Sequence, residues 1–248
     1  MKKRLSLIAM VLTAAISSLQ TVSASPVDSP SVYFTVDDIR VDVELIRSGV
    51  GWSFDSSAID VRDGDGALRA SVALRGFLDP DPSIAFALSV IDFGTPTTFT
   101  FGFSTPIVPT GPLTTVSSSL MGELTEGDVE GVSISPIGSH ILTSVVLTPS
   151  TTMGVDIGDA ASFPSGVNPY GPFSTGPQNG PTGIWTGLFT TVSFLMSGNS
   201  DLVSLSGTAR IDNRASRVPD GGPGFILSLG VLVSLAASAR WRQTRRAS

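Results

Sequence analysis

Short runs in which apolar and polar residues alternate recur along most of the chain, and glycine, proline or aspartate separates many of them. In the run 39–45, for example, Ile39, Val41 and Val43 alternate with charged residues. Because successive side chains of a strand point to opposite faces, this period of two predicts strands with one face in a core and the other in water. We expect strands at 32–36, 39–45, 59–62, 68–75, 84–90, 98–104, 116–124, 129–134, 141–147, 184–196 and 202–211.

The spacing of these runs favours an antiparallel β-sandwich or jelly roll. Strands at short intervals, with glycine and proline between them, are typical of all-β folds. Helix-forming Glu, Lys and Gln are scarce. The sequence therefore predicts a single all-β domain over residues 25–217. Within it, Asp63 to Gly66 predicts a hairpin turn, and Asp37-Asp38 predicts a bulge because the alternation changes phase there.

The first 24 residues have the three parts of a secretory signal peptide. Lys2, Lys3 and Arg4 precede an apolar run at 5–16, and small residues lead to a cleavage site after Ala24. We expect signal peptidase to cut there and to leave the body exported across the inner membrane. The chain has no cysteine, which excludes lipid attachment at this site, disulfides, and metal or catalytic sites built on thiolates.

Residues 218–248 combine a turn, an apolar run and a cluster of positive charges. The run at 225–239 is uncharged and predicts a short transmembrane helix. Its 15 residues would extend about 22 Å, whereas a permanent span needs about 20 residues, so we expect a temporary single-pass anchor. The positive charges that follow it keep that side in the cytoplasm and the body outside. They are Arg240, Arg242, Arg245 and Arg246.

The motif before the apolar run consists of Val218, Pro219, Asp220, Gly221 and Gly222. With the run and the arginine-rich tail at 240–246, it resembles the PEP-CTERM sorting signal of Gram-negative bacteria, with Asp in place of the family's Glu. The resemblance implies that an exosortase, a membrane-embedded cysteine transpeptidase, releases or transfers the body to the cell surface or extracellular matrix. The two glycines before an apolar run also resemble the GlyGly-CTERM signal, which rhomboid-type proteases process.

The exported body is strongly acidic. Residues 25–217 hold 20 acidic residues against 8 arginines, a net charge of −12, and no lysine or arginine lies between Gly76 and Ala209. This charge argues against a nucleic-acid partner, which would require a basic surface. The terminal signals and the acidic body together favour a non-enzymatic surface or extracellular-matrix protein associated with exopolysaccharide.

No catalytic site is predicted. His140 is the only histidine, and no G-x-S-x-G elbow accompanies it. It precedes an expected strand, so capping a turn fits it better than general-base catalysis. A pair of carboxylates for glycoside hydrolysis could come from Glu123, Glu126 and Glu130, but a solvated acidic turn accounts for the same residues.

Calcium is the metal whose ligands the body offers. One histidine and no cysteine cannot fill a tetrahedral zinc site. Asp60, Asp63 and Asp65 supply the hard oxygen ligands that calcium prefers, but they lack the glutamate of an EF-hand loop. A hairpin turn explains Asp63 to Gly66 without an ion, so both interpretations stand.

Residues 158–183 depart from the strand pattern. The segment has 6 glycines and 5 prolines, a composition that predicts a long loop without a regular ladder. Tyr170, Phe173 and Trp185 lie in it or beside it, and aromatic rings of this kind can stack on sugar rings. A carbohydrate-binding module that uses this loop, with calcium as an aid, is therefore the alternative functional hypothesis.

Overall fold

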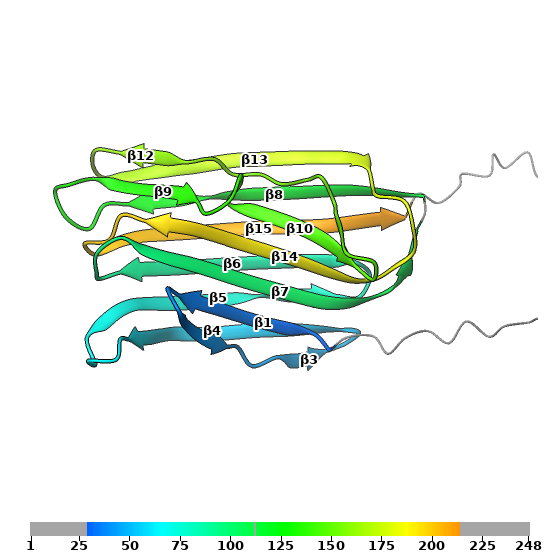
Figure 1. Ribbon diagram of the computed structural model, residues 1–248, viewed down its shortest axis with the longest axis horizontal. Coiled ribbons are helices and arrows are strands. Elements are labelled where there is room, and N and C mark those ends of the chain that lie inside the picture. Colours follow the sequence, from blue (N-terminus) through cyan, green and yellow to red (C-terminus); the bar gives the residue numbers. More distant parts are fainter. Residues whose placement is uncertain (1–28, 112, 214–248) are drawn as a thin grey trace, which may run out of the picture.

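The computed structural model describes residues 29–111 and 113–213, which form two antiparallel β-sheets that face each other as a sandwich (Figure 1). Over this part of the chain the regular elements are all strands, and no helix there is long and apolar enough to cross a bilayer. The first and last described residues lie at the same end of the sandwich. The signal peptide predicted at 1–24 and the sorting signal predicted at 218–248 lie outside the described residues.

The first sheet has eight strands and follows the order β11-β10-β14-β7-β1-β2, while β9 pairs with β14 and with β12. Its long strands β7 and β14 pair with each other and form its centre. The members are β1 (Ser31–Val36), β2 (Ile39–Asp42), β7 (Thr97–Thr110), β9 (Val132–Pro136), β10 (Leu142–Leu147), β11 (Thr151–Thr152), β12 (Ala161–Phe163) and β14 (Trp185–Met196).

The second sheet has seven strands in the order β13-β8-β15-β6-β5-β4-β3. The last strand of the chain, β15, lies between β6 and β8, so the end of the domain completes the middle of this sheet. The members are β3 (Ile46–Ser48), β4 (Gly51–Arg62), β5 (Leu68–Asp79), β6 (Ser83–Asp92), β8 (Thr114–Thr125), β13 (Val167–Asn179) and β15 (Asp201–Asn213).

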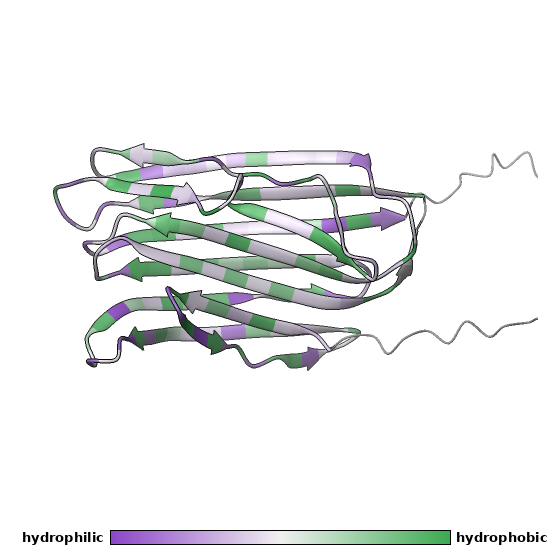
Figure 2. Ribbon diagram, in the orientation of Figure 1, coloured by the Kyte–Doolittle hydropathy of each residue, from purple (hydrophilic) through white to green (hydrophobic). Residues whose placement is uncertain are grey.

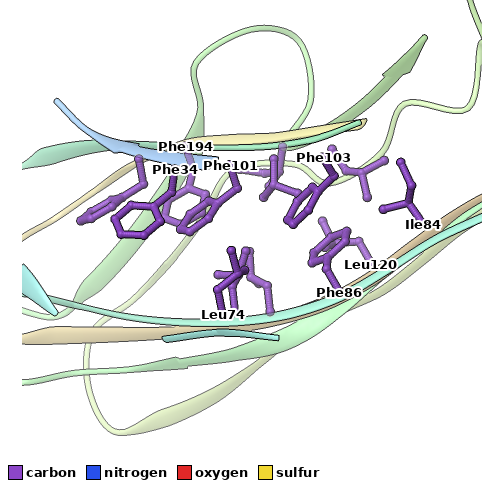
Figure 3. Packing of buried hydrophobic residues seen from close by; sticks show 14 of the residues in the cluster. Phe34, Leu74, Ile84, Phe86, Phe101, Phe103, Leu120 and Phe194 are labelled. Atoms are coloured by element: carbon purple, nitrogen blue, oxygen red, sulfur yellow. The ribbon is translucent and has the colours of Figure 1, made fainter. Parts of the chain in front are cut away.

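The inward faces of both sheets form one hydrophobic core. Phe34, Phe101 and Phe194 come from the eight-stranded sheet, and their rings pack side by side about 6 Å apart. Phe103 of the same sheet stacks on Phe86 of the seven-stranded sheet, with 4.9 Å between ring centroids. Figure 3 shows these rings meeting the side chains of the opposite layer. The core therefore joins the two sheets through aromatic as well as aliphatic contacts.

The predicted all-β sandwich is confirmed, and Figure 2 shows hydrophobic and hydrophilic residues alternating along many strands. The hairpin predicted at Asp63 to Gly66 is also confirmed and joins β4 to β5. The bulge predicted at Asp37-Asp38 is wrong. These two residues form the turn of the β1–β2 hairpin, in which Val36 pairs with Ile39 and Asp37 has a φ of 50°. The alternation changes phase because the chain reverses direction there.

The long loop predicted over 158–183 is also wrong. Most of the segment forms β12 and the 13-residue edge strand β13, which pairs with β8. The ladder shifts register at Gly171-Pro172 and at Gly176-Pro177, where two residues of β13 face one residue of β8. Each bulge places a glycine at positive φ, at 87° and 97°. Bulges on an edge strand accept proline, which has no amide hydrogen for a regular ladder.

Candidate functional site

A hollow of about 760 Å³ lies on the outer face of the seven-stranded sheet. It extends over six neighbouring strands, from β4 to β13. At the usual distance between paired strands this width is about 24 Å. Sites that bind small molecules commonly have volumes of ~300–1,000 Å³. The hollow therefore has the size of a ligand site and a width that suits an extended ligand lying across the strands.

Small side chains form the floor of the hollow. The ladder sets them in two neighbouring rows across β5, β6 and β15, and each alternates with a core residue. An alanine or serine side chain contributes only one or two heavy atoms, so the middle of the sheet face stays open. The floor residues are Ala73, Ala87, Ser89, Ser204 and Ser206.

A β-bulge borders the hollow on each side. On β4 the register shifts between Ser56 and Ile59, so residues 57 and 58 face Ala73 of β5. On β13 the Gly171-Pro172 bulge faces Met121 of β8 and lines the hollow directly. A bulge bends its strand and increases the local twist. Bulged strands on both sides thus favour a concave face between them.

Three charged side chains line the hollow. Arg75 of β5 and Asp55 of β4 lie opposite each other in the ladder, and Glu123 of β8 lies opposite Ser204. All three are exposed. No ion pair joins any of them to another residue of the described part of the chain. The Ser204 hydroxyl donates to the Ser89 hydroxyl at 3.3 Å. The three charged groups and the remaining hydrogen-bonding capacity of the serines can bind hydroxyl or charged groups of a ligand.

The carboxylates of the hollow do not form a hydrolytic pair. Asp55 and Glu123 are four strand spacings apart, about 19 Å, whereas glycosidases need carboxylates about 5–10 Å apart. The two other glutamates considered from sequence contact loop groups. Glu126 accepts a hydrogen bond from the Gly166 amide at 2.9 Å, and Glu130 accepts one from the Asn199 side chain at 3.3 Å. Both contacts fit the acidic-turn interpretation.

The aromatic residues expected to bind sugars do not form an exposed platform. Trp185 is fully buried, and Tyr170 is 2% exposed. The Tyr170 hydroxyl donates to the Asp159 carbonyl at 2.6 Å, and burial, together with the nearby Asp159 carboxylate, raises the pKa of Tyr170. Phe173 is partly buried and packs against Tyr170 at 4.8 Å between ring centroids. These aromatic side chains stabilise the fold, because the segment that carries most of them is a strand packed on the core.

Of the aspartates considered as calcium ligands, Asp63 and Asp65 lie in the hairpin turn. Asp63 Oδ1 accepts hydrogen bonds from the amides of Asp65 and Ala67 at 3.0 and 2.9 Å, which closes the turn between β4 and β5. Asp60 lies within β4, opposite Ser71. Within residues 29–111 and 113–213, no three histidine, aspartate or glutamate side chains gather as a metal site would require. The turn interpretation accounts for Asp63 and Asp65.

His140 lies in the bend before β10. Its Nδ1 is 3.7 Å from the carboxylate of Asp159, whose side chain is 75% exposed. Asp159 also receives the Tyr170 hydroxyl bond at its carbonyl. The histidine thus belongs to the contacts that hold the chain around Asp159, and it is not among the residues that line the hollow.

Two fully buried carboxylates face the interior, on the side of the sheet away from the hollow. Asp92 and Asp201 are opposite each other on β6 and β15. Asp92 Oδ1 accepts hydrogen bonds from the Gly94 amide at 3.1 Å and the Thr97 hydroxyl at 3.0 Å. Burial raises the pKa of Asp92. Asp201 accepts the Gly127 amide at 2.9 Å, so both carboxylates hold turns against strand ends.

Comparisons with known proteins leave the chain without an assigned family. No family model matches it, and no curated protein matches it. Among solved structures, one similar chain belongs to the structure of the infectious bursal disease virus Gx strain, with 10% identity and a TM-score of 0.23. That alignment covers 77% of this chain and about half, 52%, of the viral chain.

Only a few of the residues around the hollow have a role that the sequence predicts. Glu123 was considered for catalysis and Tyr170 for stacking, while Arg75, Ser204 and Ser206 had no assigned role. These residues come from β5, β8, β13 and β15, and only the register of four separate pairings brings them together. The Gly-Pro pairs were the available signal, because one of them forms a side of the hollow.

Proposed function

We propose that this chain is an exported, non-enzymatic protein of the cell surface or extracellular matrix whose sandwich binds a polysaccharide in the hollow. The observation that carries the proposal is the hollow itself, a concave face about 24 Å wide with a floor of alanine and serine. Serine hydroxyls match the hydroxyl groups of a sugar chain as both donors and acceptors. Met121 and Pro172 add apolar surface on the β13 side, against which the C–H faces of sugar rings can pack.

Several features favour binding over catalysis. The two carboxylates that line the hollow are too far apart for glycoside hydrolysis. His140 lies outside the hollow, beside Asp159. The site is instead built from small side chains on paired strands of a sheet. Such a site holds a ligand in place without an evident acid–base pair to act on it.

The export part of the proposal rests on the two ends of the sequence. Signal peptidase would cut after Ala24, and an exosortase-like transpeptidase would act at the motif from Val218 to Gly222 while residues 225–239 tether the chain. The body would then reach the outer surface or matrix of a Gram-negative bacterium. The first and last described residues lie at the same end of the sandwich. A tether attached at that end would leave the faces of the sheets clear of the membrane.

The binding proposal is tested by filling the hollow. Ser206→Trp places an indole on its floor, and the full chain in mild detergent is tested for retention on immobilised dextran and on polygalacturonate. We expect at least a tenfold loss of affinity for whichever polymer the unmodified protein binds. Thr143→Trp, on the outer face of the other sheet, is the matched control and should bind normally. Retention unaffected by Ser206→Trp, or no retention of the unmodified protein, contradicts the proposal.

The export proposal has its own test. Pro219→Ala combined with Asp220→Ala removes the residues that the sorting enzyme is expected to recognise. Cell fractionation should then show an uncleaved, membrane-bound form in place of the released protein. Unchanged release would contradict processing at this motif.

A further inference from the structure

Arg75 differs from the other arginines of the described residues because it has no partner there. Six arginines lie within residues 29–111 and 113–213. Three of the others pair with carboxylates, one donates to a backbone carbonyl and one lies over an indole ring. They are, in that order, Arg40, Arg69 and Arg210, then Arg62, then Arg47. The side chain of Arg75 forms no hydrogen bond, ion pair or ring contact with any described residue, although its backbone pairs with β4 and β6.

The position of Arg75 makes this freedom relevant to binding. It is exposed on β5, it lines the hollow, and its ladder neighbour on β6 is the small Ala87. Asp55 lies opposite it on β4, yet no ion pair joins them. The remaining residues that line the hollow include no other cation. A single unpaired guanidinium therefore stands beside a floor of hydroxyl groups in a strongly acidic molecule.

We propose that Arg75 binds an anionic substituent of the polysaccharide, a carboxylate or a sulfate, and that the ligand of the hollow is an acidic polysaccharide. This inference rests on the proposed function. The planar guanidinium donates two parallel hydrogen bonds to such a group, which fixes its orientation as well as its position. The serines then bind hydroxyl groups further along the chain, towards β8 and β13.

The two carboxylates of the hollow distinguish an acidic ligand from a neutral one. An acidic ligand is repelled by Asp55, next to Arg75, and by Glu123, about 14 Å away across three strand spacings. A neutral ligand would use the same carboxylates as hydrogen-bond acceptors for its hydroxyls. Removing the charge of Asp55 therefore strengthens the binding of an acidic ligand and weakens that of a neutral one.

The experiment measures the affinity of the full chain, in mild detergent, for three soluble polymers. Polygalacturonate carries carboxylates, dextran sulfate carries sulfates, and dextran is neutral. EDTA is present throughout, so that a divalent cation cannot bridge the acidic protein to an acidic polymer. The variants are Arg75→Gln, Asp55→Asn and the hollow-filling Ser206→Trp. Thermal unfolding checks that each variant folds, and exposed substitutions of this kind change stability by about 0.5 kcal/mol or less.

We expect the unmodified protein to bind at least one anionic polymer more tightly than dextran, and the preferred polymer identifies the anion. Arg75→Gln should lower that affinity at least tenfold, and Asp55→Asn should raise it severalfold. The inference is overturned if Arg75→Gln lowers the affinity for charged and neutral polymers equally, or if Asp55→Asn lowers the affinity for the anionic polymer. Neither result contradicts binding in the hollow. Anionic binding that Ser206→Trp leaves intact overturns the proposed function as well.

Discussion

The two sheets of the sandwich differ in what covers their outer faces. On the eight-stranded sheet, the ring of Tyr33 lies over Gly102, where an added Cβ would come within 2.3 Å of a ring atom. The guanidinium of Arg40 in turn covers that ring at 3.8 Å from its centroid. On the seven-stranded sheet, Ala87 and Ser206 leave a space that remains open as the hollow. Small residues on a sheet make a site only where no neighbouring ring covers them.

This difference is independent of how the core is built. Both sheets contribute to the same core, and the stacked pair of Phe86 and Phe103 joins them. The outward positions of each strand can therefore change without changing the residues that hold the sheets together, because successive side chains point to opposite faces. Variants of the core should affect both faces together, and variants of one face should leave the other unchanged.

The largest effect is expected from removing the shared support. Phe103→Ala deletes a fully buried ring that contacts Phe54 and Phe86 across the sandwich. We expect the free energy of unfolding to fall by about 3–5 kcal/mol, measured by urea denaturation. Phe103→Leu, which keeps most of the volume, should cost clearly less. A loss below ~1 kcal/mol for the alanine variant would mean that this ring is not part of a close-packed core.

The covered and the open face are compared directly by adding the same side chain to each. Gly102→Val forces Tyr33 from its place over the strand, and we expect a loss of about 1–3 kcal/mol in the free energy of unfolding. Ala87→Val extends into the open hollow and should change stability by about 0.5 kcal/mol or less. Urea denaturation of both variants gives the comparison. Equal losses would show that the hollow is not open space.

The smallest effect concerns Asp92, whose hydrogen bond to Thr97 joins β6 to β7 at the end of the sandwich. Burial raises its pKa in the folded protein. Its contribution is therefore fully present below the unfolded pKa of about 3.9, and it declines as the pH rises through the folded pKa. Asp92→Asn should lack this decline. The free energy of unfolding of the unmodified protein should thus fall relative to that of the variant as the pH rises, with both measured at several pH values.

Asp92→Asn also tests whether a change in the core leaves the outer face of the sheet unchanged. Because Asp92 points into the interior, the substitution should leave polymer binding in the hollow unchanged. A pH profile identical in both proteins would contradict the raised pKa. A change in binding would contradict the separation of core and face.

The sequence predicted the sandwich because the alternation of residues such as Ile84, Phe86 and Leu88 depends only on local geometry. It did not predict β13, since glycine and proline usually mark loops, and the bulges that accommodate them form only against β8. Trp185 shows a related limit. The expected loop beside it suggested an exposed ring, but its pairing opposite Thr110 buries the ring. The hollow was out of reach for the same reason. Its floor depends on the register of strands as far apart in the chain as β5 and β15.

The prolines of β13 have a consequence for how copies of this domain coexist. Strand β13 lies at the rim of its sheet, where unsatisfied backbone groups can recruit a strand from another molecule. No amide hydrogen is available at Pro169, Pro172 and Pro177. The two bulges also interrupt the regular ladder that a strand from another molecule would form. Even when crowded, neighbouring molecules therefore gain little from pairing strands along the β13 edge.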